Sequence, residues 1–282
     1  MLSLMLLACS QKSSLTSIEP PPSPPPPVKK EEKPATPQRI RVGSNVQAAY
    51  QGPAAQWVGQ GAALSDAQIA ELQQALAKNP EDVCARAYLI AFGRDYVQDI
   101  TDHKVWMIAH HPEWDGFLTA YFSGASRPED RERFEQAWRK HIGPDQQNAH
   151  VLHHAAVFFK LHEPELAEAL LERAIRAGTD TPLHLEGLGQ LYGWAARRRR
   201  ENAAFADYAR SKLIAATDPF VLAGASFEIG AHNGKAMYGG ELGAALRARI
   251  RELRISELPR LPSHFTEYDQ FKCPFMPRLR AR

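Results

Sequence analysis

The chain has 282 residues, of which 44% are hydrophobic and 23% charged, with 34 Lys and Arg side chains against 32 Asp and Glu. This composition excludes a collagen-like repeat, a chain that is disordered throughout and a polytopic membrane protein, because no stretch approaches the roughly 18 apolar residues of a spanning helix. Three cysteines are too few for a disulfide-rich scaffold. We therefore expect one or two globular domains together with segments that do not fold.

The first residues combine an apolar run with a cysteine. Leu6-Leu7-Ala8-Cys9 resembles a bacterial lipobox, in which a signal peptidase cuts before a cysteine whose thiol carries a diacylglycerol. The apolar run has only eight residues and no Lys or Arg precedes it, so a short cytosolic terminus is the alternative. We predict that residues 1–9 are a short signal segment and that Cys9 is lipidated.

Residues 10–53 are predicted to be a disordered, proline-rich linker. Nine of the chain's 21 prolines fall between Pro20 and Pro37. Because proline fixes φ and donates no hydrogen bond, we expect an extended polyproline II segment, and at about 3.1 Å per residue the chain from Cys9 to Pro37 could reach about 90 Å. Such a segment can be a ligand for an aromatic groove, but a semi-rigid spacer is favoured because nothing beside the prolines specifies a binding motif.

Helical signals recur between residues 54 and 255, and strand signals do not. Ser65 and Gln68 predict a capping box at the start of a helix that ends at Asn79-Pro80. Its buried stripe is predicted to be Ile69, Leu72 and Leu76. A second clear helix is expected from Pro164 to a left-handed cap at Gly178. Its apolar face is predicted to contain Leu166, Ala167, Leu170, Leu171, Ala174 and Ile175.

A bulky residue followed three positions later by a small one recurs along this region. Such a pair fits a helix that packs closely against a partner helix. The pairs are Leu72/Ala75, Trp106/Ala109, Phe134/Ala137, Leu171/Ala174, Tyr208/Ser211 and Leu242/Ala245. Their small residues lie 34, 28, 37, 37 and 34 positions apart.

With this spacing the chain resembles the tetratricopeptide repeat (TPR) family, whose unit is a 34-residue helix–turn–helix. The resemblance covers about residues 65–254 and is best in Leu185–Tyr192, which has the family's Leu-Gly-x-x-Tyr. A partial match lies at Trp114, Phe117, Leu118 and Tyr121, and a third unit aligns through Val151, Ala155, Phe158 and Ala167. Gly93 stands where the family has an aromatic residue, and an insertion lies around Arg197–Arg200.

The resemblance implies an all-α fold, an irregular α-α superhelix over residues 54–255 that follows the disordered proline-rich segment. In such a solenoid each repeat buries its apolar stripe only against its neighbours, and the concave face binds protein segments. The inward positions Leu188, Tyr192 and Phe158 are then candidates for partner contacts or for the core.

No motif of fixed spacing identifies a reaction centre. The chain has no His-Glu-x-x-His, no phosphate-binding Gly-x-x-x-x-Gly-Lys loop, no Gly-x-Ser-x-Gly elbow and no Cys-x-x-Cys. We therefore predict no enzymatic activity, no catalytic residue, no cofactor and no small-molecule substrate. An envelope enzyme with a site assembled from distant residues is the weaker alternative.

The histidines give the best remaining lead for a site. His150, His153 and His154 lie within about 100° of one another on a helix, and imidazoles at positions i and i+4 can chelate a transition metal. No cysteine nearby completes a metal site, and the repeat register points His154 inward. Hydrogen-bonded structural histidines are therefore favoured over a metal site, and His110-His111 is read as a helix end.

Two cysteines remain outside the lipobox. Cys84 is predicted to be a small buried residue of a helix, and Cys273 lies in the tail. Free thiols are favoured, and pairing of the two in an oxidising envelope is the alternative.

Residues 256–282 are predicted to be an irregular aromatic and basic tail. Phe265, Tyr268, Phe271 and Phe275 are expected to fold back over the last repeats as a cap, or else to reach into a partner. Residues 247–282 hold nine Lys and Arg against four Asp and Glu. Solvated faces are favoured over contacts with acidic protein or lipid headgroups, and no nucleic acid is expected.

Taken together, these features predict a non-catalytic protein–protein interaction scaffold. A TPR-like domain would be tethered to the bacterial envelope through lipidated Cys9, and its partner would be a protein or peptide. The alternative is a cytoplasmic interaction protein whose first residues are no signal.

Overall fold

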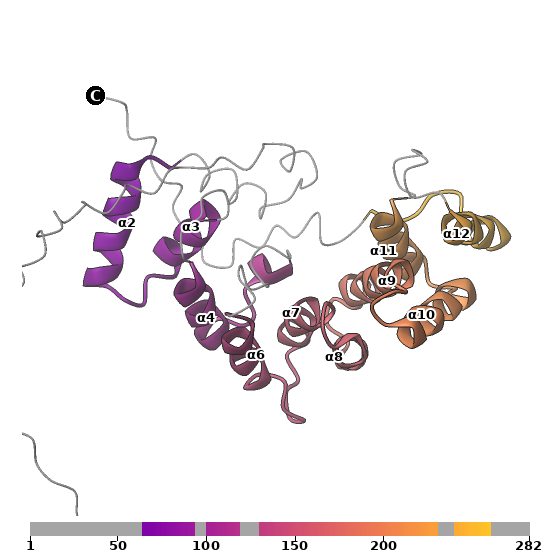
Figure 1. Cartoon of the computed structure of the whole chain (residues 1–282), viewed down its shortest axis with the longest axis horizontal. Coiled ribbons are helices and arrows are strands. Elements are labelled where there is room, and N and C mark those ends of the chain that lie inside the picture. Colours follow the sequence, from indigo (N-terminus) through magenta and orange to yellow (C-terminus); the bar gives the residue numbers. More distant parts are fainter. Residues whose placement is uncertain (1–63, 94–99, 119–129, 231–239, 261–282) are drawn as a thin grey trace, which may run out of the picture. The chain divides into compact units, whose positions relative to one another are not determined.

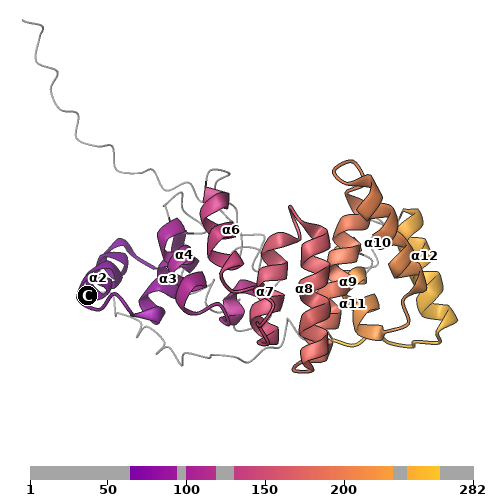
Figure 2. The same ribbon diagram turned by 90° about the horizontal axis from the view of Figure 1, so that it is seen from below.

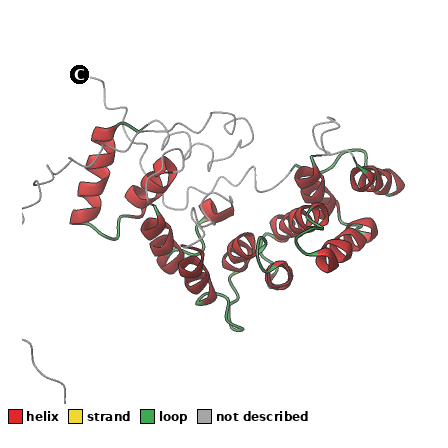
Figure 3. Ribbon diagram, viewed as in Figure 1, coloured by secondary structure: helices red, strands yellow, loops and turns green. Residues whose placement is uncertain are grey.

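The computed structural model describes residues 64–93, 100–118, 130–230 and 240–260. Within these ranges the chain forms helices joined by turns and contains no strand, as Figure 3 shows. The all-α prediction is therefore confirmed for the described part of the chain. The predicted signal segment 1–9, the linker 10–53 and the tail after Arg260 lie outside the described residues.

Ten α-helices and one short 3-10 helix, η1, make up the described residues (Figure 1). In chain order they are α2 (Asp66–Lys78), α3 (Val83–Gly93), α4 (Thr101–His110), η1 (Asp115–Leu118), α6 (Arg131–Arg139), α7 (Ala149–Phe159), α8 (Pro164–Ala177), α9 (Thr181–Arg197), α10 (Ala203–Ala215), α11 (Pro219–Ile229) and α12 (Glu241–Glu252). None of these helices is both long enough and apolar enough to cross a membrane.

Helix ends fall where short sequence signals predict them. The backbone N–H of Gln68 donates to Ser65 Oγ at 3.3 Å, and the Ser65 N–H donates to Gln68 Oε1 at 2.9 Å, which completes the predicted capping box. At the end of α8, Gly178 has a φ of 79°, the left-handed conformation that glycine adopts without a steric penalty. These two predictions are confirmed.

Helices that are close in sequence pack against each other. Contacts join α2 to α3, α3 to α4, α4 to α6, α7 to α8, α8 to α9 and α9 to α10. Figure 2 shows α7, α8 and α9 side by side. Helix α11 packs on α9, and α12 contacts both α10 and α11. Packing between successive helices is typical of helical repeats, in which each unit buries its apolar face on its neighbours.

Two clusters of buried side chains form the core. A small one lies between α2 and α3 and contains Leu64, Ile69, Leu72, Ala85, Tyr88 and Leu89. The larger one extends from α3 to α12. Its largest fully buried members are Trp138, Phe117, Phe134 and Phe159, and the Phe117 and Trp138 rings meet edge to face with centroids 5.1 Å apart.

The predicted register of bulky and small pairs is wrong in two helices. In α4, Ala109 is exposed and the buried side chains are those of Thr101, Lys104, Met107 and Ile108. Trp106 is half-buried, with the Arg86 guanidinium 4.0 Å above its ring. In α10, Tyr208 is 38% exposed, and the helix buries Phe205, Ala206, Ala209 and Leu213. The rings of Trp106 and Tyr208 are amphipathic and can lie at the edge of the core. The predicted pattern therefore placed these two side chains on the wrong face of their helices.

The partial repeat match at Trp114 and Phe117 does not produce an α-helix. Asp115–Leu118 forms only the 3-10 turn η1. A Cβ atom added to Gly116 would lie 2.6 Å from the Trp114 ring, so glycine is what allows that ring to fold over this turn. Tyr121, the last residue of the match, lies outside the described residues.

Helices α9 and α11 cross with their backbones almost in contact. A Cβ atom added to Gly189 would lie 2.0 Å from the carbonyl oxygen of Val221, and one added to Gly224 would lie 2.2 Å from that of Glu186. Such distances are possible only because both residues lack a side chain. The two glycines therefore allow α9 to lie directly against α11, and this fixes the surface that the two helices present.

Candidate functional site

Polar side chains from α7, α9 and α11 gather on one surface. We call this surface, formed by Val157, Lys160, Gln190, Arg197 and Glu228, the α7/α9/α11 face. Lys160 Nζ lies 3.5 Å from Glu228 Oε1, and Arg197 Nη2 lies 3.3 Å from Glu228 Oε2. The carboxylate of α11 thus bridges the end of α7 and the end of α9.

This ion pair network is half-buried, which distinguishes it from an ordinary surface pair. The side chains of Lys160 and Glu228 are only 15% and 16% exposed. Partial burial reduces screening by solvent, so such pairs orient side chains more firmly than exposed ones do. These ion pairs therefore help to hold α7, α9 and α11 in fixed positions relative to one another.

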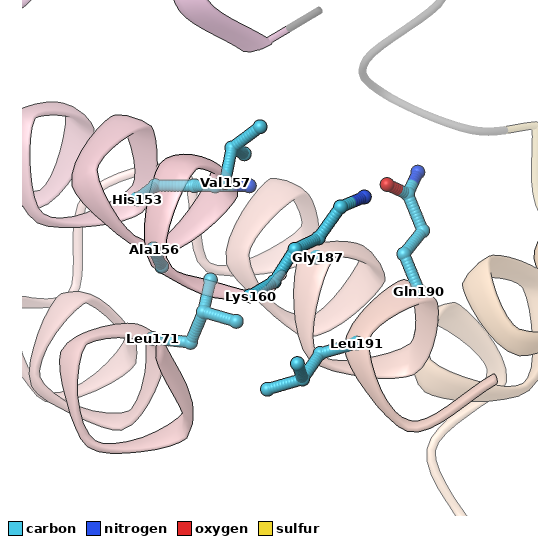
Figure 4. A pocket seen from close by; sticks show the side chains of 8 residues that line it. All are labelled: His153, Ala156, Val157, Lys160, Leu171, Gly187, Gln190 and Leu191. Carbon is cyan, nitrogen blue, oxygen red and sulfur yellow. The ribbon is translucent and has the colours of Figure 1, made fainter. Parts of the chain in front are cut away.

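A small pocket opens on the same face between α7 and α9 (Figure 4). It is lined by His153, Ala156, Val157, Lys160, Leu171, Gly187, Gln190 and Leu191. In this view the Lys160 and Gln190 side chains extend upward, and the Leu171 and Leu191 side chains lie lower. Its cavity of about 10 Å³ holds about one water molecule, so the pocket can accept the tip of a side chain but no larger ligand.

Behind the pocket, four imidazoles form a cluster between α7 and α9. His153 Nδ1 lies 2.9 Å from His184 Nδ1, so one of these nitrogens donates and the other accepts. His150 and His154 approach the same group, with ring centroids 5.9 Å from His184 and 6.5 Å from His153 respectively. The sequence analysis missed His184 because it lies 31 residues after His153 and only the packing of α9 brings them together.

The histidines of α7 are fixed by protein groups. His154 is fully buried, and its Nδ1–H donates to the carbonyl oxygen of Pro112 at 2.8 Å. His150 Nε2 lies 2.8 Å from Asp180 Oδ2. The interpretation of His154 as a hydrogen-bonded structural histidine is confirmed. Among the described residues, no group of three or more His, Cys, Asp or Glu side chains is placed to hold a metal ion.

Burial of the cluster favours neutral imidazoles. Burial, followed by repulsion from the nearby His184, holds the pKa of His153 well below its ordinary value. Burial likewise lowers the pKa of His184 to about 4, with His150 as the next cause. The His153–His184 hydrogen bond thus joins two uncharged rings at neutral pH.

The predicted contact residues turn out to be core or framework positions. Phe158 is buried and its ring stacks on that of Phe134. Tyr192 is buried, and its hydroxyl donates to Glu168, which also accepts from the Tyr208 hydroxyl at 2.7 Å. Leu188 is partly buried against the large core cluster.

The arginine run after α9 is mostly paired with carboxylates. Arg198 lies 3.1 Å from Glu201, Arg199 lies 3.0 Å from Asp207, and Arg197 belongs to the α7/α9/α11 face. The Arg198 guanidinium also lies 5.0 Å from the centre of the Trp194 ring. These contacts agree with the interpretation of this run as a solvated loop rather than a binding patch.

Cys84 differs from the prediction. It is half-buried on α3 and is disulfide-bonded, so the preference for a free thiol is wrong. Its apolar neighbours in the sequence indicated a small core residue, and such neighbours carry no information about a disulfide partner. Cys9, Cys273 and the four aromatic residues of the tail lie outside the described residues.

Comparisons with protein-family models, with characterised proteins and with solved structures found no match to this chain. A functional assignment therefore has to come from the residues themselves.

Proposed function

We propose that this protein is a non-catalytic interaction scaffold of the bacterial envelope. In this proposal a TPR-like superhelical domain is tethered through lipidated Cys9 and a proline-rich spacer, and it binds a protein or peptide segment on the α7/α9/α11 face. The observation that carries the binding role is the face itself, where helices from three successive pairs align polar side chains beside an opening.

The chemistry of the face suits a peptide. Gln190 donates one amide N–H to Glu186 Oε1 at 2.6 Å and has a second N–H and a carbonyl oxygen for a partner, and Lys160 offers a donor beside the carboxylate of Glu228. Groups of this kind pair with main-chain N–H and C=O groups, while the pocket between Val157 and Leu191 accepts only the tip of a side chain. Helical repeats recognise extended segments in this way because their surface is long and fixed before binding.

The disulfide of Cys84 supports the envelope as the location. Disulfides form and persist in oxidising compartments such as the bacterial periplasm and are rare in the cytoplasm. A lipid anchor would place the helical domain in such a compartment. The lipobox-like Leu6-Leu7-Ala8-Cys9 supplies the residue that would carry the anchor.

A photo-crosslinking amino acid at Gln190 tests the binding role. In cells we expect one dominant crosslinked protein from this position, because the Gln190 side chain lines the pocket and is only partly buried. The same amino acid at Glu172, an exposed position of α8, is the matched control and should give at least about fivefold less of that product. Equal yields from both positions, or no product from Gln190, would contradict the proposed face.

Cys9→Ser tests the anchor. We expect the wild-type protein to sediment with membranes and to keep its fatty acids through denaturing electrophoresis, because a thioether-linked diacylglycerol is covalent. The variant should lose the label from radioactive palmitate and shift to the soluble fraction. Cys84→Ser is the control that should keep both properties, and an unlabelled wild type would rule out the anchor.

A further inference from the structure

The α7/α9/α11 face lies directly on the histidine cluster. His153 lines the pocket of this face, and its Nδ1 lies 2.9 Å from His184 Nδ1 near the start of α9. We infer that this pair is a pH-sensitive switch, which holds α7 against α9 at neutral pH and on acidification opens their junction and releases the bound segment. The release of a partner rests on the proposed function, whereas the opening depends only on the residues of the junction.

The His153 ring lies against the backbone of α9. A Cβ atom added to Gly187 would lie 2.6 Å from His153 Nε2, so only glycine leaves room for the ring at this position. His153 is 4% exposed, and His184 is fully buried. A single proton preserves the hydrogen bond of the pair, because an imidazolium still donates to a neutral ring. The cost of protonation is therefore that of a charge placed between the helices, away from water.

The neighbouring groups increase this cost. Burial lowers the pKa of His153 most, followed by repulsion from His184. Further repulsion comes from three groups of α7, which are His154, His150 and Lys160. Burial also dominates for His184, and Asp180 opposes it by favouring the charged ring. The Asp180 carboxylate lies 2.8 Å from His150 Nε2 and is 42% exposed, so it offsets little of the cost.

Helix α8 and the turn η1 bring apolar side chains to the cluster. Leu171 of α8 belongs to the wall of the pocket, and the Phe117 ring of η1 lies 6.1 Å from the ring of His154. On α9, Glu186 lies about 160° around the helix from His184, because it is two residues further along. A positive charge at the pair is therefore poorly compensated while the junction is closed.

The direction of the switch follows from where the protons bind. An exposed histidine titrates near pH 6.5, whereas the pKa of His184 in the closed junction is about 4. Each ring that is charged only in the open state raises the opening constant about eightfold between pH 7 and pH 5.5, and two such rings raise it about sixtyfold. Acidification therefore opens the junction, and a return to neutral pH closes it.

Opening of the junction would dismantle the binding face. Lys160 lies seven residues after His153 and hence on nearly the same side of α7. Gln190 lies three residues after Gly187, on the neighbouring turn of α9. A movement of α7 at His153 therefore carries Lys160 away from Gln190, and it also pulls Lys160 from Glu228, whose carboxylate bridges α7 and α9.

Hydrogen–deuterium exchange of the full-length protein tests the opening without any partner. After correction for the intrinsic pH dependence of exchange, the opening constants of amides in α7 and the first half of α9 should rise at least about tenfold from pH 7.0 to pH 5.5. Those in α2, which packs in a separate core cluster, should rise less than about twofold. The His153→Asn, His184→Asn double variant should show no rise in α7. An equal rise in all helices, no rise in wild-type α7, or a double variant that opens like wild type would overturn the switch.

Photo-crosslinking in isolated membranes tests the release. The product from the crosslinking amino acid at Gln190 should fall at least about fivefold from pH 7.0 to pH 5.5 and recover at pH 7.0. In the His153→Asn, His184→Asn background the ratio of the two yields should stay near one, which controls for titration of the partner. A wild-type yield that does not change with pH would contradict the release, although the face would still bind. No product at either pH, together with the predicted opening of α7, would count against the proposed function and leave the opening established.

Discussion

Replacing Gly189 with alanine should destabilise the protein by about 3 kcal/mol, although alanine is the better helix former by about 1 kcal/mol. The reason is the crossing of α9 and α11. The new methyl group would lie 2.0 Å from the Val221 carbonyl oxygen, and a backbone atom of a helix cannot move aside as a flexible side chain can. Relief requires the two helices to separate, which opens the core between them.

A graded series of alanine variants makes this expectation specific. Gly224→Ala should cost about as much as Gly189→Ala, because its methyl would lie 2.2 Å from the Glu186 carbonyl oxygen. Gly193→Ala should cost much less, since the nearest atoms lie at 3.0 to 3.2 Å and helix propensity offsets the contact. Gly143→Ala, with nothing within 4 Å, is the control. Urea unfolding measures the free energy of unfolding of all four variants. Equal values would show that the backbones of α9 and α11 do not lie as close together as the structure has them.

The crossing of α9 and α11 also shows a limit of sequence-based prediction. Features that depend on adjacent residues could be predicted, whereas a contact between distant residues could not. The capping box at Ser65 and the left-handed cap at Gly178 each depend on a few adjacent residues, so their sequence was sufficient. The role of Gly189 depends on a carbonyl more than thirty residues later. The sequence placed this glycine in a repeat motif but gave no sign of the backbone it touches.

Register errors have a related physical origin. Helix α10 carries two aromatic residues three positions apart, Phe205 and Tyr208, and either could face the core. The deciding contact is made by the Tyr208 hydroxyl, which reaches Glu168 of α8 forty residues earlier. Periodicity alone cannot distinguish a buried ring from a ring at the rim whose hydroxyl binds a neighbouring helix.

Residues of the candidate site were the hardest to predict. Lys160, Arg197 and Glu228 lie on three different helices, and each alone resembles an ordinary charged residue on a helix surface. The buried Lys104 is a similar case, because a lysine within the apolar stripe of α4 contradicts the usual pattern. Burial lowers the pKa of this lysine to about 8. Only the fold brings such groups together or encloses them.

Acidification from pH 7 to pH 5.5 should remove about 2 kcal/mol of stability through His153 and His184. Both pKa values are lowered in the folded protein, to about 4 for His184, whereas an unfolded histidine titrates near 6.5. Below pH 6.5, His153 and His184 therefore bind protons in the unfolded chain but not in the folded chain. The free energy of unfolding falls as a result. The stabilisation from these two histidines is fully present above about pH 7. It declines as the pH falls, until the pH approaches the folded pKa of His184.

Asparagine at both positions provides the matched variant, because its amide can preserve a hydrogen bond near the two Nδ1 atoms without a titratable group. We expect the His153→Asn, His184→Asn double variant to lose less than about 0.5 kcal/mol over the same pH interval, whatever its stability at pH 7. Urea unfolding at pH 7.0, 6.25 and 5.5 measures these slopes. A double variant as sensitive to pH as wild type would show that other groups account for the acid sensitivity.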